Sequence, residues 1–199
     1  MFIAKCKVKS LTPISFSKKV LVPKEDHETA AQHEERTWKS RCHINGRGNV
    51  VIPSTFFTGA LREGAKLLNK KVVGGGNNTY TKHFLVGARA LNEVDLGVTP
   101  EQVNREDLFV PSDGMKGGGK RVDKTFPVVH EWEGTIKYLV TDDKIDPTTF
   151  KEALINTGIN VGLGRFRPRN GGDKGMFKVV GDIEYTQVKD AAEIQTAMT

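Results

Sequence analysis

The chain has 199 residues, with 30 lysines and arginines against 24 aspartates and glutamates, and a sequence pI near 9.3. This length suits a single domain with large insertions, and the excess of positive charge favours a polyanionic partner. No stretch approaches the ~18 apolar residues of a membrane span, and lysines interrupt Met1–Ser10 where a signal peptide needs an apolar run, so we expect a cytoplasmic protein without a membrane partner.

The first predicted element is a strand over Phe2–Lys9, because apolar and polar residues alternate there. One face would bury Phe2, Ala4, Cys6 and Val8, and the other would expose the cations Lys5, Lys7 and Lys9. A polar stretch of mixed charge follows over residues 24–39, and "RCHINGRGNVVIP" then predicts a hairpin that turns at Asn45–Gly48. We therefore expect an insertion over about residues 24–52.

A long helix is predicted over Ser54–Asn69, where apolar residues recur at helical spacing and Ser54 is available as the N-cap. His83–Leu91 and Gly134–Asp142 predict two further strands. Between these strands, residues 97–132 form a second insertion, in which "SDGMKGGGKRVDKTF" indicates a thumb-like hairpin with a mobile, basic tip.

A second helix is predicted in "DPTTFKEALINTG", with Asp146 as N-cap, Pro147 at the first helical position and Gly158 as the stop. A last strand is expected over about Gly175–Tyr185. Without the insertions, the order is strand, helix, strand, strand, helix, strand. This order predicts a single α+β domain over residues 1–199 with a ferredoxin-like, or RRM-like, βαββαβ core: an antiparallel sheet with both helices on one face.

Motifs for nucleotides, metals and catalysis are incomplete in this chain. "GMKGGGKR" resembles the start of a Walker A loop, but Arg121 stands where the magnesium-binding Ser or Thr belongs, and "GLGRFR" lacks the third glycine of a dinucleotide fingerprint. The five histidines and the cysteines Cys6 and Cys42 lack metal-ligand spacing, and two cysteines are too few for a disulfide scaffold. We expect reduced thiols, no metal and no cofactor.

The segment "NVGLGRFRPRNGGDKGMFKV" combines glycines with arginines at every second position. In an extended chain, Arg165, Arg167 and Arg169 would project to one side, with Lys174 beyond them. Glycines would let the backbone approach a sugar-phosphate chain, at Gly162, Gly164, Gly171 and Gly172. The alternative is that the glycines only end the helix and turn the chain into the last strand. Phe166 and Phe177 are predicted to be core anchors.

These segments resemble the RAMP superfamily, the CRISPR-associated proteins that bind or process guide RNA, and phage-encoded proteins of the same type. The resemblance lies in "GLGRFRPRNGGDKGMFKV", in "FIAKCKVKSLTPISFSK" and in "VIPSTFFTGALREGAKLL". It implies an RRM-like core that binds RNA, often as a repeated subunit that coats the strand, with a thumb-like hairpin that separates bases. For a phage-encoded member, the compartment would be the host cytoplasm.

The favoured hypothesis is a non-catalytic protein that binds single-stranded nucleic acid, RNA in preference to DNA. The predicted phosphate contacts are the loop residues above, Lys5, Lys7 and Lys9 on the first strand, and Lys116, Lys120 and Arg121 on the thumb-like hairpin. A second hypothesis is a metal-independent endoribonuclease, in which His43 beside Arg41 and Arg47 would act as the base. A third is a scaffold that binds acidic protein surfaces with the same basic loop.

Overall fold

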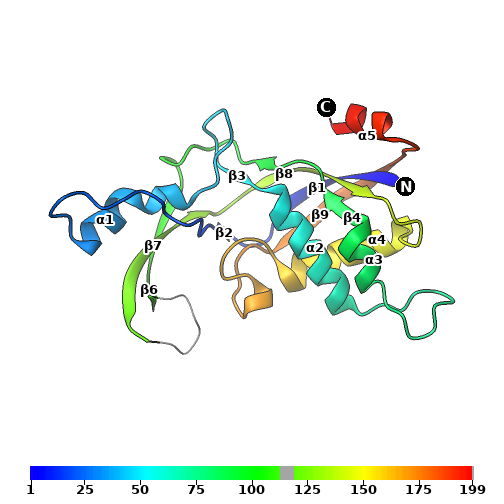
Figure 1. The fold of residues 1–199 in the computed structure, drawn as a ribbon, viewed down its shortest axis with the longest axis horizontal. Helices are drawn as coiled ribbons and strands as arrows, with labels where there is room; N and C mark the ends of the chain where they lie inside the picture. Colours follow the sequence, from blue (N-terminus) through cyan, green and yellow to red (C-terminus); the bar gives the residue numbers. More distant parts are fainter. Residues whose placement is uncertain (113–118, 199) are drawn as a thin grey trace.

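The computed structural model describes residues 1–112 and 119–198 of an elongated α+β protein with antiparallel sheets. Lys116, one of the predicted nucleic-acid contacts, lies outside the described residues. The helices α2 (Ser54–Leu68), α3 (Thr81–Gly87) and α4 (Pro147–Asn156) gather at one end of the molecule (Figure 1). The helix α1 (Ala30–Thr37) and a long hairpin project from the other end. None of the helices in the described part of the chain combines the length and the apolar composition needed to cross a bilayer.

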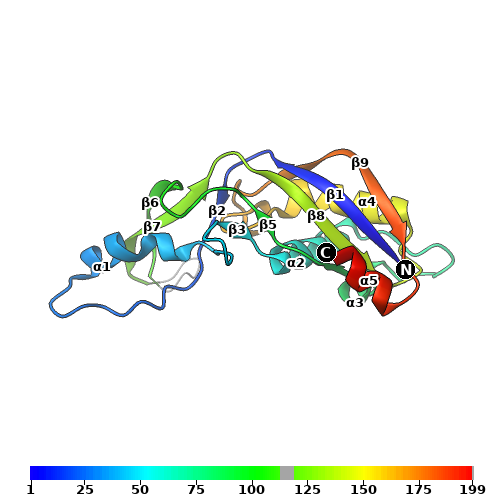
Figure 2. The same cartoon turned by 90° about the horizontal axis from the view of Figure 1, so that it is seen from above.

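The central sheet has four strands, and each pairs antiparallel with its neighbours. They are β1 (Phe2–Ser10), β4 (Ala88–Ala90), β8 (Glu133–Val140) and β9 (Phe177–Gln187), in the order β4-β8-β1-β9. The chain therefore runs strand, helix, strand, strand, helix, strand through this core, and its first and third strands are central. Figure 2 shows β1, β8 and β9 side by side.

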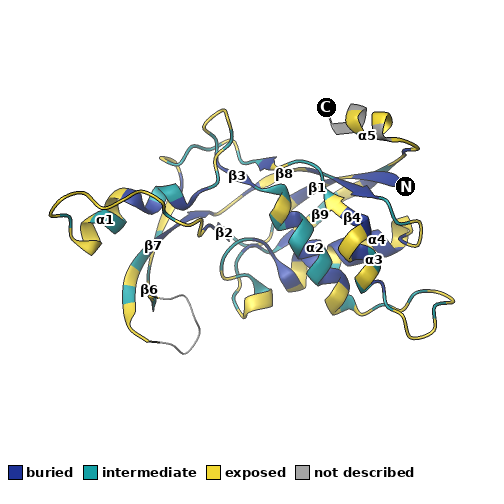
Figure 3. Ribbon diagram, viewed as in Figure 1, coloured by how far each residue is buried: buried dark blue, intermediate teal, exposed yellow. Residues whose placement is uncertain are grey.

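The main core lies between this sheet and two helices, α2 (Ser54–Leu68) and α4 (Pro147–Asn156). The predicted alternation in β1 is confirmed, because Ala4, Cys6 and Val8 are buried while the intervening lysines are exposed. The helices contribute large buried side chains to this core: Phe57, Leu61, Phe150 and Leu154. Figure 3 shows that burial is concentrated here, whereas the outer parts of α1 and of the projecting hairpin are exposed.

The projecting hairpin consists of β6 (Asn104–Pro111) and β7 (Arg121–Val129), paired antiparallel along their length. The short strand β2 (Ile14–Ser15), which follows β1, pairs with the base of β7. This three-stranded sheet connects the hairpin to the end of the central sheet. A further two-stranded sheet joins β3 (Val51–Ile52) to β5 (Val94–Asp95).

The segment over residues 24–52 contains a helix that the sequence analysis did not predict, α1 (Ala30–Thr37). It begins with a capping box, in which Thr29 accepts from the Gln32 backbone N–H and the Gln32 side chain accepts from that of Thr29. A 3-10 turn follows at Trp38–Arg41. The predicted turn at Asn45–Gly48 is confirmed: Ile44 bridges to Val50, and Gly48 adopts a φ of +84°.

The strand predicted at His83–Leu91 is wrong for most of its length. The chain forms the helix α3 (Thr81–Gly87), and only Ala88–Ala90 extends, as β4. The buried residues Tyr80, Phe84 and Gly87 are spaced four and three positions apart, which fits one helix face, while Leu85 and Val86 between them are exposed. The run of apolar residues thus predicted a strand, although the segment forms a helix that buries only one of its faces.

Two helix boundaries also differ from the prediction. Pro53 occupies the N-cap position of α2, so Ser54 is its first helical residue and not the cap. Gly158 does not stop α4: the chain continues as a π-helical turn over Thr157–Val161 and ends at Gly162, which has a φ of +69°. A Cβ on Gly158 would lie 2.1 Å from the Phe177 carbonyl oxygen, so this glycine allows close packing against β9.

The last helix, α5 (Ala191–Met198), was also not predicted. Ile194 packs with the buried residues Ile3, Leu139 and Val188, on the opposite face of the central sheet from the main core. This small second cluster explains why Ile3 is buried although it shares a face with the exposed lysines of β1. The face that the sequence analysis left open is thus partly covered at one end.

Neighbouring residues on α4 provide a test of the core. We expect Leu154→Ala to lower the free energy of unfolding by ~2 to 5 kcal/mol, because Leu154 is fully buried between α2 and the sheet. Ile155→Ala should cost less than about 1 kcal/mol, because Ile155 is 43% exposed. Urea denaturation of both variants measures the difference. Equal costs would contradict this assignment of the helix face.

Candidate nucleic-acid interface

A groove with a volume of about 1090 Å³ lies between the β6–β7 hairpin and the glycine-rich loop that precedes β9. We call it the basic groove, and the segment Gly162–Gly175 the glycine-rich loop. Figure 1 shows the hairpin (green) and the loop (orange) on the two sides of this region. The described residues that line it include no carboxylate. They include six cationic side chains: Lys18, Lys19, Arg41, Arg121, Lys124 and Arg165. Three phenylalanines also line it: Phe109, Phe126 and Phe166.

Arg165 contacts both walls of this groove. Its Cζ atom lies 3.5 Å from the ring centroid of Phe126 on β7 and 3.7 Å from that of Phe166 in the loop. Its Nη1 atom is buried and has no hydrogen-bond partner among the residues that the structure describes. Burial lowers the pKa of Arg165 to about 10; the nearby Arg41 adds to this lowering, and Glu106 opposes it. The residue remains cationic at neutral pH in a poorly solvated place.

Arg41 joins Arg165 on the same aromatic ring. Its Cζ atom lies 5.5 Å from the Phe126 centroid, and its Nη2 donates to Glu34 Oε2 on α1 at 2.9 Å. Its Nη1, like that of Arg165, is buried without a hydrogen-bond partner in the described part of the chain. Two guanidinium groups, each with a buried donor, therefore meet on Phe126 and concentrate positive charge in this part of the groove.

The other two loop arginines point elsewhere. The loop is not extended as predicted: Pro168–Asn170 forms a 3-10 turn. Arg167 Nη2 and Arg169 Nε lie 3.4 and 3.6 Å from the two carboxylate oxygens of Glu63 on α2. The three arginines therefore do not share one side, and one carboxylate serves two of them. Arg169 remains 46% exposed.

Lys174 connects the loop to the hairpin. Its Nζ donates to Glu106 Oε1 on β6 at 2.7 Å, and its backbone N–H donates to the Phe166 carbonyl at 3.0 Å. The side chain is mostly covered, with 18% exposed. This lysine is placed to hold the two walls of the basic groove together.

The glycines of the loop are packed against the protein itself. A Cβ on Gly164 would lie 2.5 Å from the Ser15 carbonyl oxygen, one on Gly162 would lie 2.8 Å from Pro168 Cδ, and one on Gly172 would lie 1.8 Å from the Phe166 carbonyl oxygen. Gly171 adopts a φ of +76° at the end of the 3-10 turn. These contacts support the alternative in which the glycines allow the chain to fold back, and Gly162, not Gly158, ends the helix.

The two phenylalanines of this segment have different environments. Phe177 is 1% exposed and packs edge-on to Phe57, so its prediction as a core anchor is confirmed. The same prediction for Phe166 is wrong, because its side chain is 36% exposed and lines the groove. Its φ of +55° is unusual for a residue with a side chain. The turn at Phe166 gives the loop a conformation in which the ring lies on Arg165.

The predicted contacts on β1 lie on a different surface from the groove. Lys5 is 3.1 Å from Glu184 on β9, and Lys7 is 3.3 Å from Glu133 on β8. Lys9 is exposed and sits opposite Lys178 and Glu133 in the sheet register. The positive charge on this face is therefore partly neutralised by neighbouring strands.

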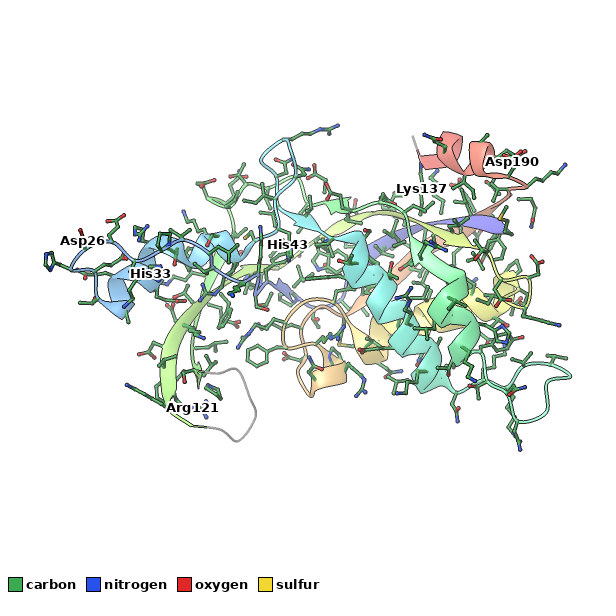
Figure 4. All side chains as sticks on the ribbon, viewed as in Figure 1. Asp26, His33, His43, Arg121, Lys137 and Asp190 are labelled. Carbon is green, nitrogen blue, oxygen red and sulfur yellow. The ribbon has the colours of Figure 1, made fainter. Side chains whose placement is uncertain are left out.

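The two described cations near the hairpin tip, Lys120 and Arg121, have different environments. Lys120 is exposed, whereas Arg121 lies over the ring of Phe109 and donates to the Phe109 carbonyl. Figure 4 labels Arg121 at the far end of the hairpin. Arg121 lines the basic groove, and Lys120 does not.

His43, the candidate base, packs against aromatic rings away from this lining. Its ring centroid lies 5.2 Å from that of Phe56 and 6.4 Å from that of Phe16. Burial, followed by the charge of Lys18, lowers its pKa. Arg41 points to Glu34 and Phe126, and Arg47 lies in the exposed turn, so the three residues do not form one constellation. Figure 4 shows His43 in the middle of the molecule.

Sequence reasoning missed half of the groove. Lys18, Lys19, Lys124, Phe109 and Phe126 were not singled out, although "SFSKK" places two lysines directly after the short strand β2. Lys124 and Phe126 are two residues apart on β7, a spacing that puts side chains on the same face of a strand. That spacing was the available signal, but nothing in the sequence indicated that this face meets the glycine-rich loop.

Comparisons with known proteins give a likeness of fold. No protein-family model and no curated protein sequence matches the chain. The fold is similar to that of a chain in the cryo-EM structure of the type III-B Cmr-beta bound to cognate target RNA, with a TM-score of 0.52 and 8% identity, over 92% of this chain and 60% of that one. A chain of a CRISPR RNA-guided surveillance complex aligns with a TM-score of 0.37 and 9% identity, over 90% of this chain and 66% of that one.

The chain thus spans 60% of the length of the Cmr-beta chain whose fold it shares. This likeness agrees with the fold that the resemblance to RAMP proteins implied, and at 8% identity it concerns the fold alone.

A pair of glycine variants tests the structural role of the loop glycines. Gly172→Ala should destabilise the protein by about 1 to 3 kcal/mol, because its methyl group would overlap the Phe166 carbonyl oxygen. Gly59→Ala is the control: it lies within α2 with nothing within 4 Å of the new Cβ, and we expect it to stabilise by about 0.5 to 1 kcal/mol. Thermal or urea denaturation measures both. If Gly172→Ala leaves the free energy of unfolding unchanged, the packing role of Gly172 would be contradicted, and its role would be to let the backbone contact a partner.

Proposed function

We propose that this chain is a RAMP-type protein with a ferredoxin-like core that binds single-stranded nucleic acid, RNA in preference to DNA, without cleaving it. The support from the fold is the strand order β4-β8-β1-β9 with α2 and α4 inserted between strands, together with the likeness to a chain of the Cmr-beta structure bound to target RNA. In this proposal the chain acts as a subunit of a ribonucleoprotein assembly, along which copies could repeat.

The observation that carries the proposal is the composition of the basic groove. Six cations and three phenylalanines line it without a carboxylate among the described lining residues, and two guanidinium groups there keep buried donors unpaired. Phosphates would pair with the cations, and bases would meet the aromatic rings, which is the combination that single-strand binding requires. An acidic protein surface would form ion pairs with the cations, but its carboxylates would not stack on the rings.

The groove is a better site than the open face of the central sheet. Lys5 and Lys7 on that face already have carboxylate partners, and α5 packs on one end of it. Lys18 and Lys19 in the groove are exposed, and among the described residues Lys124 donates only to a backbone carbonyl, that of Ser112. A polyanion binds more favourably to cations that are not already paired with a carboxylate, because no ion pair has to be broken first.

Salt titration tests this site. Binding of a labelled single-stranded RNA should weaken with salt, with a slope of log K against log salt of about −0.7 for each neutralised phosphate. Lys19→Ala and Arg121→Ala should each weaken binding at low salt and make this slope shallower by about 0.7, because each removes one groove cation. Fluorescence anisotropy at several salt concentrations gives both quantities.

Two lysines at the other end of the molecule serve as matched controls. Lys82→Ala on α3 and Lys151→Ala on α4 remove the same charge from exposed positions outside the groove, and we expect affinity and slope to stay near the wild-type values. Equal losses in controls and groove variants would mean that net charge alone drives binding. RNA binding that is absent, or independent of salt, would refute the proposal.

A further inference from the structure

We propose that Phe126 and Phe166 form a slot for one unstacked nucleobase, and that Arg165 fills this slot in the free protein and is displaced by the base. This inference rests on the proposed function and specifies how the groove recognises its ligand. A guanidinium group is planar, and two rings cannot share one of its faces with centroids at 3.5 and 3.7 Å. The rings therefore lie on opposite faces of the Arg165 guanidinium, at 3.5 Å and 3.7 Å from its Cζ atom.

These two distances are the ones that a flat base requires on its two faces. A base between two rings makes van der Waals contact at about 3.5 Å on each side. The slot is thus open to the correct width, and the group inside it has the same thickness as a base. All three residues of the slot line the basic groove, so a strand in the groove has access to it.

Both rings are held in place by the backbone around them. Phe126 lies within β7, is 4% exposed and pairs in register with Glu106 on β6. Phe166 is fixed by the bond from the Lys174 N–H to its carbonyl and by the close approach of Gly172. Its φ of +55° stores strain at this position, as is common at binding sites. Because the backbone is fixed at both positions, little main-chain entropy is lost when a base enters.

The Arg165 side chain, in contrast, has a buried hydrogen-bond donor without an acceptor among the described residues. In the observed position its Nη1 is closed off from solvent and lacks a hydrogen bond, so a phosphate cannot reach this atom unless the side chain moves. Displacement by an uncharged base would return the guanidinium to the groove, where it can pair with a phosphate of the same strand. The backbone N–H of Arg165 donates to the Ser15 carbonyl, so the main chain can stay in place while the side chain moves.

The experiment compares two ligands that differ only in their bases. One is a single-stranded oligouridine of about eight nucleotides, and the other is an abasic ribose-phosphate chain of the same length. Affinities are measured at about 0.5 M salt, where phosphate contacts are strongly screened. The wild-type protein should bind the oligouridine about tenfold more tightly than the abasic chain, as expected for one stacked base.

Three variants then test which side chains form the slot. Phe166→Asn removes one ring while tolerating a positive φ, and it should abolish the preference for the base-bearing ligand. Arg165→Ala empties the slot and should keep or increase this preference, although it weakens binding to both ligands at low salt. Phe109→Ala removes the third groove phenylalanine and separates the slot from the hairpin tip. Tyr185→Leu is the control, because it removes an aromatic ring that does not line the groove and should leave the preference unchanged.

The position of the arginine side chain is followed directly by the NMR resonance of its Nε–Hε group, assigned with the Arg165→Ala variant or, if that variant does not fold, with Arg165→Lys. The resonance should move when oligouridine binds and not when the abasic chain binds.

Each other outcome refutes the inference in a recognisable way. Salt-dependent binding without a preference for bases would remove the slot and leave the proposed function intact. If Arg165→Ala loses the preference for oligouridine, Arg165 itself contacts the base and is not displaced by it. The same conclusion would follow if the Nε–Hε resonance stays in place when oligouridine binds. A preference lost only in Phe109→Ala would move the base site to the hairpin tip. Absence of RNA binding under all conditions would refute both proposals.

Discussion

The stacking of Arg165 between Phe126 and Phe166 is the interaction on which the candidate site depends. The two rings belong to parts of the chain that are far apart in sequence, the hairpin strand β7 and the glycine-rich loop, and the guanidinium contacts both. The ion pair of Lys174 with Glu106 adds a second connection between the same parts. Because the walls of the basic groove come from these two segments, the two contacts together set the shape of the groove in the free protein.

The same contact explains why a cationic groove can be stable without a ligand. Like charges on Arg41 and Arg165 repel, and burial raises the cost of both. The π face of Phe126 offsets part of this cost, and Glu34 and Glu106 lie at the edges of the cluster. The protein thus keeps its cations together with aromatic rings inside the groove and with carboxylates outside it. A polyanion would pair with the exposed cations of the groove, Lys18 and Lys19.

Parts of the fold that depend on local periodicity could be predicted from the sequence. The alternation in β1, the helical spacing of Phe57, Leu61 and Leu154, and Asp146 with Pro147 at the start of α4 all appear in the structure. The capping box of α1 was also present in the sequence, as Thr29 and Gln32, but it lies in a stretch without an apolar stripe. The apolar run at α3 gave the wrong period because Leu85 and Val86 are exposed.

The candidate site could be predicted only in part, for a different physical reason. The abundance of arginine and glycine identified the loop, but the directions of Arg165, Arg167 and Arg169 depend on Phe126 and Glu63, which are distant in sequence. The glycines could not be assigned without knowing that Ser15 and Phe166 lie against them. Spacing describes which residues share a face, and it does not describe which face another segment will cover.

The most direct measurement of the central claim is ultraviolet crosslinking of the protein to single-stranded RNA, followed by identification of the crosslinked residues by mass spectrometry. The account predicts crosslinks in the segments that line the basic groove, at residues 17–20, 108–111, 121–126 and 165–170. Crosslinks concentrated instead on the exposed face of the central sheet, around Lys5, Lys7 and Lys9, would contradict it.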